Sequence, residues 1–326
     1  MNPKIRLRNF ILLGSISVLF VVLPAVLISV GVIDGYTAQI FTLAGINAIM
    51  AISVNIISGI TGQLSLGQAG FMAVGAYSCI WFSQVALMPL PVAVIAGGLL
   101  AAFIGFLIGF PTLKLSGDYL AIVTLGFGEI LRVIFVNLKG ITGGANGKRF
   151  TTILAARADI AWVVIIGILV MVVILLQNFL RSTYGRAIFS VREDEIAANS
   201  NGISVFRYKM TGFVIAAFVA GIGGAIYAPF IGFVKPDLSS FNRSVDYLIY
   251  VVLGGMGSIT GSILAAFILT YLQEFLRFLQ EYRLLFYPVI LILVMLFRPQ
   301  GLLGMKELSF TGLMDKLTAK RKPENG

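Results

Sequence analysis

The stretch Leu90–Leu113 reads LPVAVIAGGLLAAFIGFLIGFPTL and contains no Asp, Glu, Lys or Arg. It is longer than the ~20 apolar residues that an α-helix needs to cross the hydrocarbon core of a bilayer. The whole chain follows this pattern, since 58% of its 326 residues are hydrophobic and only 12% are charged. Soluble domains carry about 25% charged residues. The sequence therefore predicts an all-α fold, a polytopic integral membrane helix bundle.

Apolar runs of comparable character fill most of the remaining chain. The run Ser244–Leu276 is longer than one crossing requires and too short for two, and Gly254-Gly255-Met256-Gly257-Ser258 interrupts it. We expect a short or re-entrant piece there and then a longer helix from about Thr260, which gives about ten transmembrane segments in total. The other runs are Phe10–Ile33, Tyr36–Ser58, Leu64–Met88, Tyr119–Leu138, Ile160–Leu180, Phe206–Val234 and Leu284–Phe297.

Basic residues indicate the orientation of the chain. It carries 24 Lys and Arg against 14 Asp and Glu, a net charge of +10, and the basic residues cluster between apolar runs and at the termini. Loops rich in Lys and Arg stay in the cytoplasm, so we interpret the charge as topology and not as a nucleic-acid surface. The prediction is a single transmembrane domain, 1–326, with a cytoplasmic N-terminal tail 1–9, a cytoplasmic loop 181–209 and a cytoplasmic tail 298–326. The basic loop Lys139–Asp159 falls outside in this scheme and is an exception.

Few residues could support catalysis. The chain has no histidine, which excludes Ser-His-Asp and Cys-His nucleophilic sites and His-ligated zinc. The single cysteine, Cys79, lies in an apolar run, and we expect it to be a small buried hydrophobic residue. The string Asn146-Gly147-Lys148-Arg149 lacks the first glycine and the final Ser or Thr of an ATP-binding P-loop. We predict a non-catalytic subunit with no metal site and no cofactor.

The most charged internal segment is Arg181–Ile203, RSTYGRAIFSVREDEIAANSNGI. Its centre contains good helix formers, and Gly202 is placed to end a helix. The sequence predicts a short amphipathic helix over Arg192–Gly202 outside the bilayer. Such a helix could dock on a soluble partner, and the alternative interpretation is a solvated connecting loop.

Part of this segment, Ile196-Ala197-Ala198-x-x-x-Gly202, resembles the Glu-Ala-Ala-x-x-x-Gly loop of ABC-importer permeases. Ile196 replaces the glutamate, and Glu195 stands one place earlier. The wider string from Gly185 is similar to the version in branched-chain amino acid permeases of the LivM/LivH type, and its Arg192–Ala198 part, together with Thr142–Gly147, favours LivM over LivH. Further strings that resemble this family follow in order: Thr61–Phe71, Gly75–Tyr77, Gly117–Leu125, Thr142–Gly147, Val252–Gly257 and Phe297–Leu302.

The resemblance implies a permease subunit of a bacterial ABC importer for leucine, isoleucine and valine. Its implied partners are a second permease of LivH type, two cytoplasmic ABC ATPase subunits, a periplasmic amino-acid-binding protein and membrane lipid. The implied location is the bacterial inner membrane. A urea or short-amide importer is the alternative, followed by a stand-alone secondary transporter. The residues implied in ATPase coupling are Gly185, Arg186, Arg192, Glu193, Asp194, Glu195, Ala197, Ala198 and Gly202.

Polar and glycine residues inside apolar runs or directly before them are candidates for the translocation path, because hydrocarbon penalises polar groups and glycine lets backbone unwind. Close helix packing is the alternative for the glycines, and pairing with Arg132 is the alternative for Glu129. Glu274 and Arg277 repeat that i,i+3 spacing, while Gly105–Gly109 and Gly257–Gly261 have the spacing of helix packing. The path candidates are Gly62, Gln63, Ser65, Gly67, Thr124 and Glu129.

Overall fold

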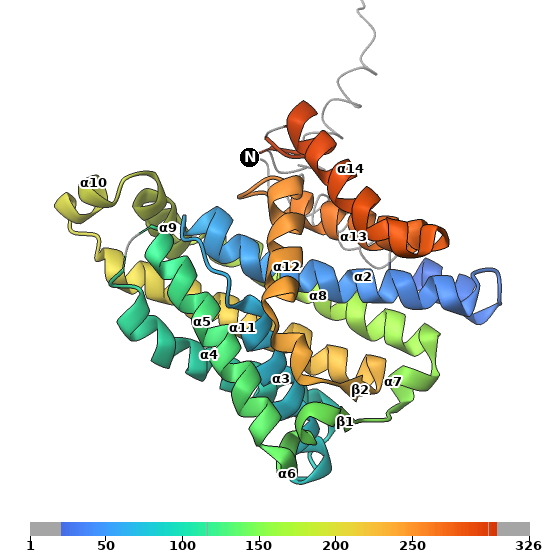
Figure 1. Ribbon diagram of the computed structural model, residues 1–326. Helices are drawn as coiled ribbons and strands as arrows, with labels where there is room; N and C mark the ends of the chain where they lie inside the picture. Colours follow the sequence, from blue (N-terminus) through green and yellow to red (C-terminus); the bar gives the residue numbers. More distant parts are fainter. Residues whose placement is uncertain (1–20, 116, 299, 305–326) are drawn as a thin grey trace, which may run out of the picture.

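The computed structural model describes residues 21–304, apart from residues 116 and 299. The chain is a bundle of helices (Figure 1). The predicted tail 1–9, the first part of the run Phe10–Ile33 (residues 10–20) and residues 305–326 lie outside the described residues. The elements are α2 (Gly35–Asn55), η1 (Ile56–Ile60), α3 (Gln68–Gln84), α4 (Leu90–Thr112), α5 (Asp118–Asn137), α6 (Lys139–Thr142), η2 (Gly144–Asn146), β1 (Lys148–Arg149), α7 (Ile153–Ala156), α8 (Ala158–Arg181), α9 (Thr183–Glu193), α10 (Glu195–Ser200), α11 (Val205–Ile231), β2 (Phe233–Val234), η3 (Pro236–Ser239), α12 (Phe241–Gly254), α13 (Ile259–Phe275), η4 (Leu276–Tyr282) and α14 (Arg283–Phe297).

Long apolar helices dominate the bundle, which confirms the all-α membrane prediction. Among the described residues, 6 helices are long and apolar enough to cross a membrane, and Leu285–Phe297 forms a shorter apolar helix. The long ones are α2 with η1, α4, α5, α8, α11 and α13. The chain is therefore a multi-pass membrane protein.

The centre of the bundle consists of α2, α3 and α11. In the apolar window of α2 with η1, 83% of the residues are buried, against 33% in α5 and 33% in α8. Small residues also let α4 approach α11 closely, because a Cβ on Gly105 of α4 would lie 2.6 Å from the Cβ of Ala217 on α11. Gly109 packs on Met210 in the same interface, so the predicted packing role of the Gly105–Gly109 pair is confirmed.

The bundle has two distinct ends (Figure 1). One carries α9 and α10, and we call it the loop end. The other carries α6, α7 and the strands β1 and β2, and we call it the sheet end. The strands pair antiparallel with Lys148 opposite Val234.

Two of the buried helices, α3 with 17 residues and α12 with 14, are shorter than a full crossing. Their first turns meet, since the Ala69 N–H donates to the Ser244 hydroxyl at 3.3 Å. From there α3 runs toward the sheet end, where Gln84 donates to the Arg149 carbonyl, and α12 runs toward the loop end. The predicted short piece within Ser244–Leu276 is confirmed: α12 ends at Gly254 and α13 begins at Ile259.

Gly257 and Gly261, which have the spacing of two packing residues on one helix face, do not lie on one helix. Gly257 has a φ of +94° and lies in the turn between α12 and α13, so it does not share a helix face with Gly261. Gly261 instead packs against the carbonyl of Gly254 at the end of α12. The turn needs glycine at this position, because residues with a side chain rarely adopt a positive φ.

Candidate functional site

The charged segment at the loop end forms two helices where the sequence predicted one. A single helix over Arg192–Gly202 is wrong, because α9 ends at Glu193 and α10 begins at Glu195. Asp194 between them has extended backbone, and its carboxylate accepts hydrogen bonds from the amides of Ile196 (2.8 Å) and Ala197 (3.0 Å). It is an N-cap, which satisfies amides that have no partner inside the helix.

The end of α10 follows the prediction. Gly202 adopts a φ of +78°. Its amide donates to Asn199 at 2.9 Å, and the Ile203 amide donates to Ala198 at 3.0 Å, the pair of bonds that defines a Schellman cap. Two short, capped helices therefore stand at this end of the bundle.

The predicted coupling residues form one contiguous segment, but they face different ways. Glu193, Asp194, Glu195 and Ala197 are exposed, whereas Ala198 is buried. Glu195 forms an ion pair with Lys209, which fastens α10 to α11. Away from this ion pair, Gly185 is buried against the carbonyl of Leu180, and Arg186 donates to the carbonyl of Arg181.

Arg192 is half-buried and faces the bundle. A Cβ on Gly62 would lie 3.2 Å from the Cγ of Arg192, and a Cβ on Gly257 would lie 3.0 Å from its Nη1. Gly62 has a φ of +70° where the chain leaves η1, and Gly257 lies in the α12–α13 turn. Arg192 thus contacts two places where the membrane helices are interrupted. Sequence reasoning missed this, because neither contact is local.

The α12–α13 turn has further partners. The Gly257 amide donates to Asn55 Oδ1 at 2.8 Å. The Leu302 amide donates to the carbonyl of Leu253 at 2.7 Å, and Gly301 packs on Gly255. Two separate glycine strings of the sequence therefore meet at the loop end.

The unwound segment Gly62–Gly67 returns from the loop end into the bundle, so the predicted run Leu64–Met88 is helical only from Gln68. Close packing against α5 holds it. The Leu66 amide donates to Thr124 Oγ1 at 3.1 Å, and a Cβ on Gly67 would lie 2.6 Å from the Thr124 carbonyl oxygen. With the start of α12, these groups form what we call the mid-bundle junction.

Polar side chains at this junction are buried without partners. Gln63 is 5% exposed and Ser65 is 2% exposed. Neither side chain has a hydrogen bond to any described residue. The same holds for Asn55 Nδ2 and the Ser58 hydroxyl, which lie nearer the α12–α13 turn. Buried polar atoms are normally hydrogen-bonded. This cluster is therefore suited to polar contacts with water or a ligand.

Glu129 lies elsewhere on α5. It forms the predicted pair with Arg132 (2.6 Å), and both side chains are about one-third exposed, at 35% and 37%. Its other oxygen accepts from the Phe241 amide at 3.3 Å, at the first residue of α12. The structure thus places Gly67 against Thr124, with Gln63 and Ser65 on the same unwound segment, and leaves Glu129 beside the start of α12.

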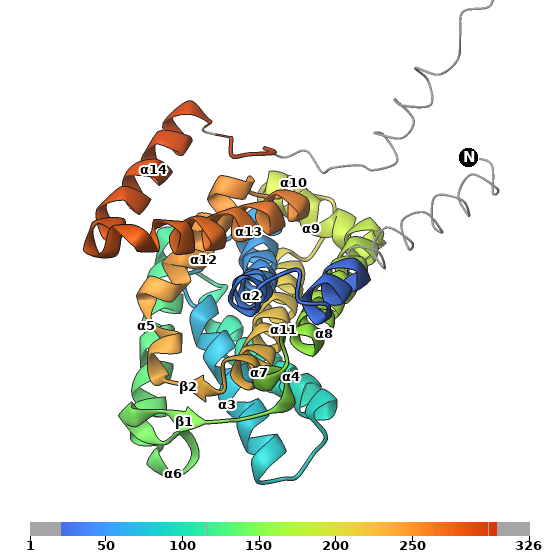
Figure 2. The same cartoon turned by 90° about the vertical axis from the view of Figure 1, so that its right-hand side faces the viewer.

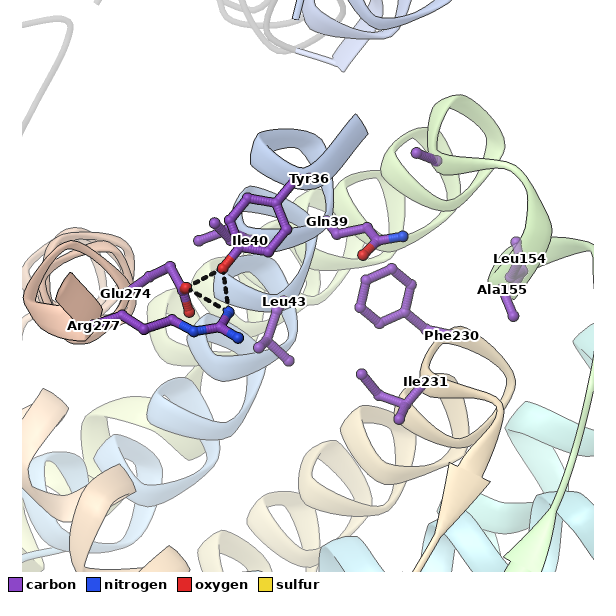
Figure 3. A pocket seen from close by; sticks show the side chains of 11 residues that line it. Tyr36, Gln39, Ile40, Leu43, Leu154, Ala155, Phe230, Ile231, Glu274 and Arg277 are labelled. Carbon is purple, nitrogen blue, oxygen red and sulfur yellow. Dashed lines mark hydrogen bonds and ion pairs between the residues drawn. The ribbon is translucent and has the colours of Figure 1, made fainter. Parts of the chain in front are cut away.

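A pocket of about 300 Å³ opens at the sheet end between α2, α7, α11 and α13 (Figure 3). The predicted Glu274–Arg277 pair is confirmed at 3.0 Å. Tyr36 joins it, since its hydroxyl donates to Glu274 and accepts from Arg277 at 2.6 Å. Nearby, the Asp159 carboxylate hydrogen-bonds Arg157 and raises the pKa of that guanidinium. These exposed networks connect helix ends and lie away from the mid-bundle junction.

Six long apolar helices, two half-length helices that start at mid-bundle and an unwound polar segment beside them define a membrane permease. The chain belongs to the family described as branched-chain amino acid transport system, permease component, which matches residues 36–295. Permease components of ABC transporters are non-catalytic.

Individual relatives agree with this assignment. The chain is 39% identical to the high-affinity branched-chain amino acid transport system permease protein LivM of Escherichia coli K12, over 82% of this chain and 70% of that protein. It is 25% identical to E. coli LivH, over 82% of this chain and 94% of the relative. It is also 25% identical to the probable LivM of Methanocaldococcus jannaschii, over 64% and 67%. No solved structure matches the chain.

Proposed function

We propose that this chain is the LivM-type permease subunit of a bacterial ABC importer and forms the path for leucine, isoleucine and valine. The observation that carries this is the family match over residues 36–295, together with 39% identity to a LivM protein. The buried, unpaired polar groups at the mid-bundle junction support a path through the same part of the molecule.

The proposed assembly contains a LivH-type permease, two cytoplasmic ATPase subunits and a periplasmic amino-acid-binding protein. The chain is one transmembrane unit of about ten segments in the inner membrane, with α3 and α12 as partial crossings. The loop end faces the cytoplasm, because its segment 181–209 is rich in Lys and Arg. Both chain termini are then cytoplasmic.

Coupling in this proposal starts at α9 and α10. Their exposed charges and the Asp194-capped start of α10 form the surface that docks on an ATPase subunit. Movement of this surface reaches the membrane helices through Arg192, since its side chain contacts Gly62 and Gly257. Both glycines have positive φ. Gly62 begins the unwound segment after η1, and Gly257 lies in the turn between α12 and α13. The chain can change direction at these two places without bending a regular helix.

The inner part of the path is lined by Gln63, Ser65 and Thr124. Gln63 and Ser65 supply uncommitted polar atoms for the charged ends of an amino acid, and Gly62 and Gly67 keep the backbone unwound beside them. The aliphatic side chain of the substrate meets apolar walls, because isoleucines and alanines dominate the surrounding core.

The test is uptake of labelled leucine by proteoliposomes that contain this chain, a LivH-type partner, both ATPase subunits and the cognate binding protein. We expect ATP-dependent accumulation that unlabelled isoleucine and valine inhibit and urea does not. Competition by urea alone would contradict the amino-acid assignment. Uptake by this chain without ATPase subunits would contradict the ABC assignment and favour a secondary transporter.

A further inference from the structure

After its last helix the chain returns to the turn between α12 and α13. Helix α13 leaves this turn and reaches the sheet end, where Arg277 donates to Tyr36. Figure 2 shows α14 at the edge of the bundle and the chain turning back from its end toward the bundle. Residues 300–304, which we call the C-terminal segment, then contact the end of α12. The path through α13 and α14 therefore starts and finishes at the same turn.

The C-terminal segment completes the end of α12. The last carbonyls of an α-helix have no partner inside the helix and are usually satisfied by the residues that follow it. Here Gly255 turns the chain away with a φ of +107°. The Leu302 amide donates to the Leu253 carbonyl at 2.7 Å, and the Leu303 amide donates to the Gly254 carbonyl at 3.3 Å. A distant part of the sequence thus supplies the cap of α12.

Glycine permits this contact on both of its sides. A Cβ on Gly301 would lie 2.6 Å from the Gly255 nitrogen, and a Cβ on Gly255 would collide with the Gly304 carbonyl oxygen. All three glycines have positive φ, which residues with a side chain rarely adopt. The two backbones therefore pack directly on each other, and a side chain at Gly301 would force them apart.

Other elements hold the same turn at Gly257. The Gly257 amide donates to Asn55 Oδ1 at 2.8 Å, and a Cβ on Gly257 would lie 3.0 Å from Arg192 Nη1. A Cβ on Gly59 of η1 would collide with the Gly257 nitrogen. The turn is thus fixed at Gly257 by η1 and α9, and at Gly255 by the C-terminal segment.

Helix α12 connects this turn to the mid-bundle junction. It has 14 residues, and its first turn contacts α3 through the hydrogen bond between Ala69 and Ser244. Because a helix is hydrogen-bonded along its length, a displacement of its last turn also displaces its first. Arg192 contacts the turn and not the helix itself, so its movement reaches α12 only if the turn stays fixed to the helix end. The C-terminal segment provides this attachment.

We infer that the C-terminal segment is a positioning element of ATP coupling. It holds the α12–α13 turn to the end of α12, so that a movement of α9 at Arg192 reaches the mid-bundle junction through α12. This inference rests on the proposed ABC-importer function and adds a second element to its coupling route. Loosening the segment should separate ATP hydrolysis from transport, whereas loss of a contact that only stabilises the fold would lower both together.

The mobility of a spin label on the turn tests the attachment without reference to transport. Met256 is 47% exposed, and Cys79→Ala removes the single cysteine, so Met256→Cys can be labelled alone. In the assembled complex the label should become more mobile after Leu302→Pro, because proline has no amide to donate to Leu253. Leu302→Ala is the matched control, since it keeps that amide. Equal mobility in the two variants would overturn the inference.

The amount of ATP hydrolysed per leucine imported tests the coupling role. In proteoliposomes, Leu302→Pro and Gly301→Ala should each raise this ratio about fivefold, a size typical of mutations that act on coupling. Leu302→Ala should keep the wild-type ratio, and the ATPase subunits should co-purify with all three variants. A wild-type ratio in Gly301→Ala, the milder change if Leu302→Pro does not assemble, would overturn the inference.

A double variant tests whether the C-terminal segment and Arg192 act on the same turn. Arg192→Ala combined with Gly301→Ala should have the ratio of the more severe single variant, because residues that act through one contact are not additive. Two effects that multiply would indicate separate routes and overturn the inference. A wild-type complex that imports urea in place of leucine would contradict the proposed function instead, while the mobility of the label would still decide whether the segment holds the turn.

Discussion

The loop end and the mid-bundle junction are built in opposite ways. At the loop end one continuous segment, 182–202, supplies the helices, their caps and their exposed charges. At the mid-bundle junction the segment 62–67, the middle of α5 and the start of α12 meet from distant parts of the chain. A continuous segment tolerates local changes, whereas a junction of three segments depends on how closely their backbones approach. Substitutions should therefore cost more at the junction.

The largest effect is expected at Gly67. A Cβ there would lie 2.6 Å from the Thr124 carbonyl oxygen, so Gly67→Ala must push the unwound segment away from α5. Overpacking of this kind costs about 1–3 kcal/mol. We expect a lower unfolding temperature of the purified complex and at least a tenfold loss of leucine uptake. Gly126→Ala is the matched control, because nothing lies within 4 Å of a Cβ at that position on α5. Equal stability of the two variants would contradict the close approach.

Arg192 joins the two regions, and its removal should separate docking from transport. Arg192→Ala removes the contacts to Gly62 and Gly257 but leaves the exposed face of α9 and α10 in place. Mutations that act on coupling alone change it by about 0.5–2 kcal/mol, roughly two- to thirtyfold in uptake. Co-purification of the ATPase subunits should be unchanged. Loss of those subunits from the Arg192→Ala complex would instead assign Arg192 to the docking surface.

The same contrast explains what the sequence could predict. The long apolar helices, the break near Gly255, the i,i+3 ion pairs and the Gly202 cap depend on neighbouring residues, and all were predicted correctly. The helix over 192–202 was wrong because Asp194 caps a new helix more favourably than it continues the old one. The contacts of Arg192 with Gly62 and Gly257 were not predictable, because they depend on how α9 packs against the ends of η1 and α12.

Asp194 tests whether the division of the loop segment matters for docking. Asp194→Ala removes the acceptor for the Ile196 and Ala197 amides and should cost about 1 kcal/mol of helix stability. We expect the affinity of the permease in nanodiscs for the ATPase subunit to fall about fivefold. Asp194→Asn is the control, because asparagine caps helices equally well without the charge. If Asn weakens binding as much as Ala, the charge of Asp194 and not its cap is responsible.

The smallest effect is expected for the ion pair between Glu195 and Lys209. The Glu195 side chain is 54% exposed, whereas that of Lys209 is 12% exposed. Ion pairs with an exposed member contribute about 0.2–1 kcal/mol. Glu195→Gln should therefore lower the unfolding temperature slightly, and the difference from wild type should shrink in high salt because salt screens the pair. Glu193→Gln makes the same charge change at an exposed residue that has no ion pair among the described residues. A salt-independent loss, or an equal loss in Glu193→Gln, would mean that α10 is held on α11 by packing of Ala198 and not by charge.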